Sequence, residues 1–77
     1  MADRPREVPV LVERLTPREH EVLVLVADGR RNKDIARELG ITDHTVKFHL
    51  AAVFGKLGAS SRTEAVRRGL QLGLIHI

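Results

Sequence analysis

The sequence predicts an all-α protein, a four-helix bundle with a central helix-turn-helix. Three observations predict this class: residues 16–19, 42–43 and 61–64 each have the composition of a helix start, apolar residues recur at helical spacing after them, and a glycine follows each such stretch. The 77 residues have room for one small domain. Residues 1–14 hold two prolines and mixed charges without a clear period, so we expect a linker or flexible N-terminal arm there and the helix-turn-helix domain over residues 15–77.

The first helix is expected to begin with a capping box at residues 16–19. In this motif the Thr16 hydroxyl accepts a hydrogen bond from the third helical N–H, and the Glu19 carboxylate accepts one from the cap. The apolar run 22–26 would also fit a buried strand, because β-branched residues dominate it. The capping box favours a helix, which would end at Gly29 because glycine adopts the left-handed conformation without strain.

A short second helix is expected from Asn32, acting as its N-cap, to about Leu39. Ala36 is small where this helix would cross the next one. Gly40 lets the backbone turn with a positive φ, and Ile41 leads directly into the third helix. Two short helices joined by a tight turn that contains glycine form a helix-turn-helix.

The third helix organises the rest of the chain. Thr42 would cap it, and Asp43 would place negative charge at the positive end of the helix dipole. Its apolar stripe consists of Val46, Leu50, Val53, Phe54 and Leu57. Its opposite face carries His44, Lys47, Phe48, Ala51 and Gly55. This outer face is either an ordinary solvated surface or, given its mixture of donors, an aromatic ring and very small residues, a surface suited to close approach by a partner.

Residues 61–64 form a second capping box, which predicts a fourth helix through about Leu72 that ends at Gly73. Val66, Leu70 and Leu74 are expected to pack inward. Small residues recur every fourth position along one side, at Ala65, Gly69 and Gly73. Two interpretations of this stripe stay open: close packing against the first helix of the same chain, or a helix–helix contact in a dimer.

Charge is unevenly distributed along the chain. The formal net charge is +3, but residues 1–28 carry 4 basic and 6 acidic side chains, whereas residues 29–68 carry 9 basic and 4 acidic ones. The basic part contains the third helix. This distribution favours a polyanionic partner, although an anionic membrane surface would fit the charge alone equally well.

Composition argues against several classes of protein. Without cysteine there can be no disulfide, thiolate nucleophile or Cys-based zinc site. No apolar run approaches the roughly 20 residues that cross a bilayer, so we expect a soluble, cytoplasmic protein with no membrane partner. The four histidines, His20, His44, His49 and His76, lack metal-site spacing, so neither a metal nor a cofactor is expected. Neither a Ser/His/Asp set nor a Gly-rich phosphate loop is present, which argues against an enzyme.

Several short runs together resemble the LuxR-type (also called NarL/FixJ-type) C-terminal DNA-binding domain of bacterial transcription regulators. They cover about residues 15–75 and comprise residues 15–19, Gly29, 32–36, 39–42, 45–47, His49, 56–58 and 61–65. The resemblance implies a third helix that enters the major groove of double-stranded DNA and a fourth helix that forms a two-fold homodimer, with RNA polymerase as a further candidate partner. An effector domain of a response regulator and a stand-alone regulator both remain open.

Position by position, the resemblance implies that the base-reading residues are His44, Lys47, Phe48 and Ala51. It implies contacts with the DNA backbone from Asn32, Lys33, Thr45 and Arg62, to which the pair Arg30 and Arg31 is added. Lys47 can donate to guanine O6 and N7, Phe48 can contact thymine methyls, and Ala51 leaves room for the helix to lie deep in the groove. Arg31 departs from the family, which usually has Ser or Thr there, so the cap of the second helix is assigned to Asn32.

Two other functions remain open. One is a helical protein-interaction module that docks a partner helix on the small-residue stripe of the fourth helix. The other is the promoter-binding region of a sigma factor, which shares the helix-turn-helix. The helix after Gly58 and the run at residues 61–65 favour the regulator over the sigma factor.

Overall fold

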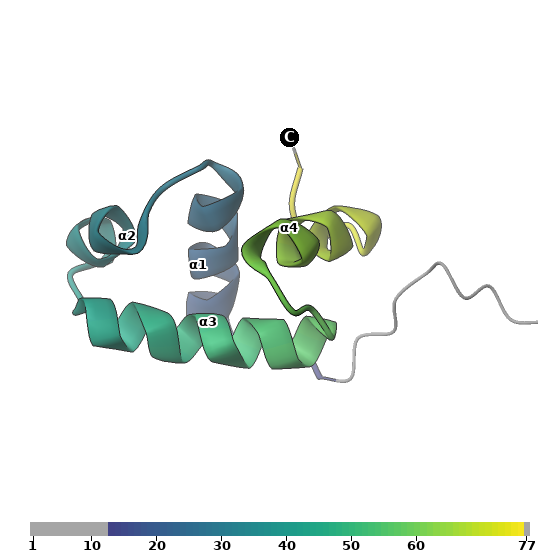
Figure 1. The fold of residues 1–77 in the computed structure, drawn as a ribbon, viewed down its shortest axis with the longest axis horizontal. Helices are drawn as coiled ribbons and strands as arrows, with labels where there is room; N and C mark the ends of the chain where they lie inside the picture. The colour runs from purple at the N-terminus through teal and green to yellow at the C-terminus, as the bar shows by residue number, and fades with distance from the viewer. Residues whose placement is uncertain (1–12, 77) are drawn as a thin grey trace, which may run out of the picture.

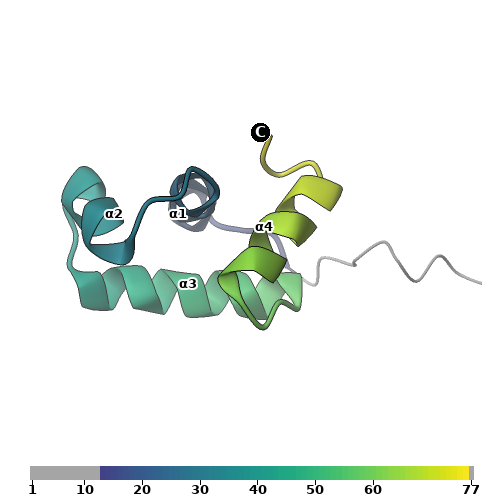
Figure 2. The ribbon, with the colours of Figure 1, turned by 45° about the horizontal axis from the view of Figure 1, so that its top comes forward.

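The computed structural model describes residues 13–76, which form four helices: α1 (Pro17–Ala27), α2 (Asn32–Leu39), α3 (Asp43–Leu57) and α4 (Arg62–Gln71). This confirms the all-α prediction. α3 runs along one side of the bundle, and α1, α2 and α4 lie on the other side (Figures 1 and 2). The opposite side of α3 is therefore uncovered. The predicted N-terminal arm falls outside the described residues except for its last two.

The ends of the helices largely follow the local sequence signals. At the start of α1 both bonds of the capping box form: the Glu19 N–H donates to Thr16 Oγ1 at 3.1 Å, and the Thr16 N–H donates to Glu19 Oε1 at 2.9 Å. The apolar run 22–26 is helical, as the capping box predicted. Gly40, at the turn between α2 and α3, has a φ of 70°. A side chain is strained in that conformation, so glycine suits this turn.

The cap of α2 differs from the prediction. Asn32 is the first helical residue, and the N-cap is Arg31, which has an extended backbone and makes no side-chain capping bond. The prediction that Asn32 caps α2 is therefore wrong. The Asn32 side-chain oxygen instead accepts a hydrogen bond from Arg62, at the start of α4.

The second capping box is only half formed. The Glu64 N–H donates to the Ser61 hydroxyl at 3.1 Å, as predicted. The Glu64 carboxylate, however, accepts from the backbone N–H of Ser60 at 2.7 Å and from the Ser60 hydroxyl at 2.9 Å. These bonds, followed by the ion pair with Arg68, lower the pKa of Glu64 from 4.5 to about 2. The carboxylate thus fastens the loop that precedes α4.

The core consists of two buried clusters that meet along α3. One joins α1, α2 and the first half of α3 through Val22, Val26, Ile35, Ala36, Val46 and Leu50. The other joins α1, the second half of α3, α4 and the C-terminal tail through Leu23, Val53, Leu57, Ala65 and Ile75. The predicted apolar stripe of α3 is confirmed, with Phe54 half-buried between the clusters. Leu70 was expected to pack inward, and this is wrong, since it is 39% exposed.

The small residues of α4 pack within the chain. Ala65 is fully buried and Gly69 is buried. A Cβ added to Gly69 would lie 3.2 Å from side-chain carbons of both Leu23 on α1 and Ile75 in the tail. The structure therefore supports the intrachain interpretation of the stripe. Ala65 and Gly69 lack the exposed surface that the predicted dimer contact needs, whereas Gly73 is exposed beyond the end of the helix.

An ion pair fixes α1 relative to α3. Lys56 Nζ lies 2.7 Å from Glu19 Oε1 and also donates to the Arg14 carbonyl at 3.0 Å. Burial alone would raise the pKa of Glu19, but the hydrogen bonds from Lys56 and from the Thr16 N–H outweigh it and lower the pKa. The pair therefore stays ionised. Its charge-assisted hydrogen bond joins α1 to α3. None of the helices in residues 13–76 is long and apolar enough to cross a membrane.

Candidate nucleic-acid interface

The uncovered face of α3 presents the residues that the sequence singled out. His44, Lys47, Phe48 and Ala51 are all exposed, and the Phe48 side chain is 69% exposed. Val46 and Leu50, which flank this face, are buried in the core. Because these two residues hold the helix, its outer side chains project in a fixed direction. A rigid helix with a protruding aromatic ring, an ammonium group and a methyl-sized residue can enter a groove and contact the groups that line it.

The N-terminus of α3 is well fixed. The Thr42 hydroxyl accepts a hydrogen bond from the Thr45 N–H at 3.1 Å, and the two hydroxyl oxygens are 2.9 Å apart. Thr45 is half-buried, so its predicted contact with a phosphate would come from a hydroxyl that is already bonded to Thr42. Next to the exposed face, the half-buried His49 ring meets the Phe48 ring edge-on, with centroids 5.9 Å apart.

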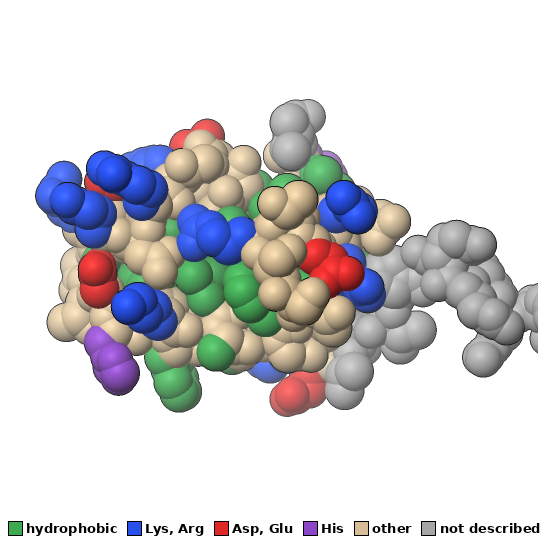
Figure 3. Space-filling model, viewed as in Figure 1, with side chains coloured by type: hydrophobic (Ala, Val, Ile, Leu, Met, Phe, Trp, Pro, Cys, Tyr) green, Lys and Arg blue, Asp and Glu red, His purple; other side chains and the backbone are tan. Residues whose placement is uncertain are grey.

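Cations gather over α2 beside this helix (Figure 3). Lys33 and Lys47 are exposed and have no carboxylate within ion-pair distance among residues 13–76. Arg31 is also exposed, but its Nε lies 3.5 Å from Asp34 Oδ2. Arg30 is paired with Glu38 and with Asp28, so its charge is largely compensated.

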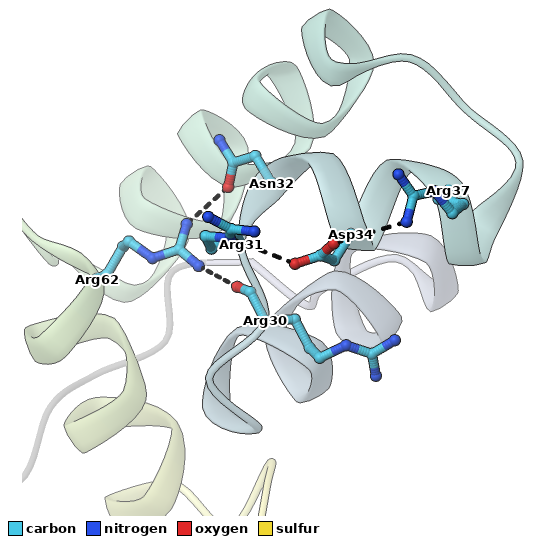
Figure 4. A network of polar contacts seen from close by, with 6 residues as sticks. All are labelled: Arg30, Arg31, Asn32, Asp34, Arg37 and Arg62. Atoms are coloured by element: carbon cyan, nitrogen blue, oxygen red, sulfur yellow. Dashed lines mark hydrogen bonds and ion pairs between the residues drawn. The ribbon is translucent and has the colours of Figure 1, made fainter.

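Arg37 is a basic residue that the sequence analysis missed. It lies four residues after Lys33 on α2, a spacing that places both side chains on one face of a helix, and this signal could have found it. Its side chain is 76% exposed, and its guanidinium lies 4.0 Å from Asp34 Oδ1. Asp34 thus lies between Arg31 and Arg37 and faces both (Figure 4).

Arg62 has a structural role that the sequence did not reveal. Its guanidinium donates to Asn32 Oδ1 and to the Arg30 carbonyl oxygen, each at 2.7 Å (Figure 4). The start of α4 is thereby joined to the start of α2 and to the loop before it. Four of the residues predicted to contact phosphates, namely Arg30, Arg31, Asn32 and Arg62, are brought together here. Lys33 lies beyond them on α2, and Thr45 lies on α3.

Comparison with known proteins agrees with this arrangement. Residues 13–68 match the family described as bacterial regulatory proteins, luxR family. Over 72 residues the chain is 47% identical to the HTH-type quorum sensing-dependent transcriptional regulator RpaR of Rhodopseudomonas palustris, a match that covers 94% of this chain and 30% of RpaR. The chain therefore matches less than a third of the length of that relative.

Solved structures show the same fold. The structure of the transcription factor GerE superposes with a TM-score of 0.76 and 37% identity, over 80% of this chain and 92% of GerE. A complex of Vibrio cholerae VqmA with ligand and DNA superposes with a TM-score of 0.76 and 31% identity, over 96% of this chain and 31% of VqmA. Together with the four-helix arrangement and the exposed face of α3, these matches establish that the chain belongs to the luxR family of bacterial regulatory proteins, whose helix-turn-helix domain it forms.

Proposed function

We propose that this chain is the part of a bacterial transcription regulator that binds double-stranded DNA sequence-specifically, in the cytoplasm, with α3 in the major groove. The observation that carries the proposal is the outer face of α3, where Phe48 is 69% exposed among His44, Lys47 and Ala51 while the opposite face is held in the core. A recognition helix needs this combination of rigid support and accessible side chains. We infer that the chain binds DNA and that it does not catalyse a reaction.

In this proposal one set of residues contacts bases and a second set contacts phosphates. Lys47 donates to acceptors on base edges, and the imidazole of His44 can donate or accept there. Phe48 covers thymine methyls, and Ala51 lets the helix approach closely. Lys33, Arg31 and Arg37 neutralise phosphates and set the register of the protein on the duplex. Arg62 supports this second set, since its hydrogen bonds hold the start of α2, and its remaining N–H groups are candidates for a phosphate contact.

The test is a fluorescence-anisotropy titration of the chain on a random-sequence duplex at several salt concentrations. We expect log K to fall linearly with log salt. The double variant Lys47→Ala, Phe48→Ala should weaken binding. Its matched control is Arg67→Ala, Leu70→Ala, which also removes one exposed cation and one exposed apolar side chain, but on α4. Absence of binding at low salt, or equal losses in the two double variants, would contradict the proposal.

We also propose that the domain binds DNA as a homodimer through α4. Since Ala65 and Gly69 are buried, the contact must use an outward side of the helix. Glu64, Arg68 and Gln71 are three and four residues apart and share such a side, away from the buried small residues. The ion pair between Glu64 and Arg68 could then be exchanged between the two copies.

Disulfide trapping tests the dimer cleanly, because the chain has no cysteine of its own. The variant Gln71→Cys should form a covalent dimer under mild oxidation when a two-fold duplex site is present. Glu21→Cys, at an exposed position on α1, is the control and should remain monomeric. Equal cross-linking of the two variants would exclude an α4 interface.

The expected contact with RNA polymerase stays a prediction. The choice between the effector domain of a response regulator and a stand-alone regulator stays open.

A further inference from the structure

A groove between α4 and the segment from the end of α1 to the start of α2 is not used by the proposed contact of α3 with bases. Helices α2 and α4 both pack against α3, but among the described residues they do not pack against each other. An open groove of about 770 Å³ lies between α4 and the residues from Val26 to Asn32. Its floor includes Val26, Val66 and Leu70. Figure 3 shows hydrophobic side chains at the surface between α2 and α4, beside Lys or Arg side chains.

The rim of the groove is cationic. Its lining includes the four arginines Arg30, Arg31, Arg62 and Arg67, and no Asp or Glu among residues 13–76. Arg30 and Arg31 have carboxylate partners outside the groove. Among the described residues, Arg62 donates to two neutral oxygens, that of the Asn32 side chain and that of the Arg30 carbonyl. Arg67 is exposed and has no carboxylate within ion-pair distance in the part of the chain that is described. The guanidinium groups of Arg62 and Arg67 therefore lie beside an apolar floor without a carboxylate partner among residues 13–76.

The cationic rim and the apolar floor together indicate which kind of molecule would bind in the groove. Apolar contact and charge neutralisation together require an amphipathic anion. A DNA backbone would supply the charge but would leave the apolar floor uncovered. A small molecule would be poorly enclosed, since such ligands favour sites that bury most of their surface. A second copy placed symmetrically on this groove would bring its own Arg67 against the same cations, which like-charge repulsion disfavours.

We propose that the groove docks an acidic amphipathic helix of a partner protein. On α4 the lining residues Thr63, Val66, Arg67 and Leu70 are three and four residues apart, so one face of the helix lines the groove. A partner helix with apolar residues at i, i+3 or i+4, and i+7 would cover Val26, Val66 and Leu70. Carboxylates beside that stripe would reach Arg62 and Arg67.

The test uses a labelled peptide and contains no DNA, so its outcome does not depend on the proposed DNA binding. The probe is a designed helical peptide of about 15 residues with leucines at the stated spacing and flanking glutamates. Its control has every glutamate replaced by glutamine, which keeps the apolar stripe. Anisotropy is measured with the natural chain, with Arg67→Glu, and with Arg14→Glu. Arg14 is exposed and does not line the groove, so its change matches the charge reversal of Arg67→Glu.

We expect the acidic peptide to bind about tenfold more tightly than the glutamine peptide, and Arg67→Glu to weaken it about tenfold, with Arg14→Glu changing it by less than about twofold. Methyl resonances of Val26, Val66 and Leu70 should shift during the titration. The proposal is overturned if the two peptides bind equally, if the acidic peptide does not bind at about 1 mM, or if the shifts lie elsewhere. It is also overturned if the groove resonances shift with the concentration of the chain alone, since a second copy would then be the occupant.

Discussion

The guanidinium of Arg62, the first residue of α4, donates a 2.7 Å hydrogen bond to the side-chain oxygen of Asn32, the first residue of α2. The backbones of these two helices do not pack against each other. The bond, together with the one from Arg62 to the backbone carbonyl of Arg30, therefore uses the Arg62 side chain to position α2 and the loop before it relative to α4. α2 is the first helix of the helix-turn-helix, so the start of this motif depends on a residue 30 positions away in the chain.

Replacing Arg62 should cost stability even when the positive charge is kept. Lysine lacks the forked guanidinium, so Arg62→Lys cannot satisfy Asn32 and the Arg30 carbonyl together. We expect the free energy of unfolding to fall by about 1–2 kcal/mol. Urea unfolding followed by circular dichroism measures it. Arg67→Lys, at an exposed position on the same helix, should leave stability unchanged, and a similar loss in both variants would refute the role assigned to Arg62.

Lys47 and Lys33 should differ in how they affect DNA affinity. Lys47→Ala is expected to weaken binding to a target duplex, selected for tight binding from a random-sequence pool, by about 1–3 kcal/mol, and to weaken binding to random duplex by less. Lys33→Ala should weaken both duplexes about equally and lower the salt slope by about one unit. Anisotropy titrations at several salt concentrations separate the two effects. Identical behaviour of the two variants on both duplexes would show that α3 does not read bases.

Asp34 should limit the affinity for DNA. Its carboxylate faces the guanidinium groups of Arg31 and Arg37, both 76% exposed, and compensates part of their charge. Asp34→Asn should raise the affinity for random duplex about threefold at low salt and steepen the salt dependence. Glu21→Gln removes the same charge from an exposed ion pair with Arg18 on α1. If that control raised the affinity equally, net charge and not the position of Asp34 would be responsible.

Acid should weaken the fold partly through Glu64. Its pKa is lowered from 4.5 to about 2, first by the hydrogen bond from the Ser60 backbone N–H. A carboxylate with a depressed folded-state pKa contributes stability that is complete above pH 4.5 and disappears as the pH falls to about 2. The stability difference between the natural chain and Glu64→Gln should therefore shrink across this range in urea unfolding experiments. A difference that stays constant from pH 7 to pH 2 would be inconsistent with the bonded carboxylate.

Local sequence signals were sufficient for the helices and for the outer face of α3. The capping box at Thr16 and the glycine after each helix act within a few residues, so their effects can be predicted without knowledge of the fold. The spacing of Val46, Leu50, Val53 and Leu57 likewise determines which face of α3 is buried. His44, Lys47, Phe48 and Ala51 follow as the exposed set because they lie on the other side of the same helix.

Contacts between residues that are far apart in the sequence could be identified only in the tertiary structure. The sequence could not show that Asn32 bonds Arg62 instead of capping α2, since the two residues are 30 positions apart. The sequence left open whether the small residues of α4 pack within the chain or form a dimer contact. The side chains of Leu23 and Ile75 approach Gly69 closely, which supports packing within the chain. The sequence by itself determined the helices and the exposed face of α3, because both depend on neighbours within one or two turns. Only the tertiary structure decided the supporting hydrogen bonds, the exposure of Leu70 and the cationic groove, because these depend on how separate helices pack.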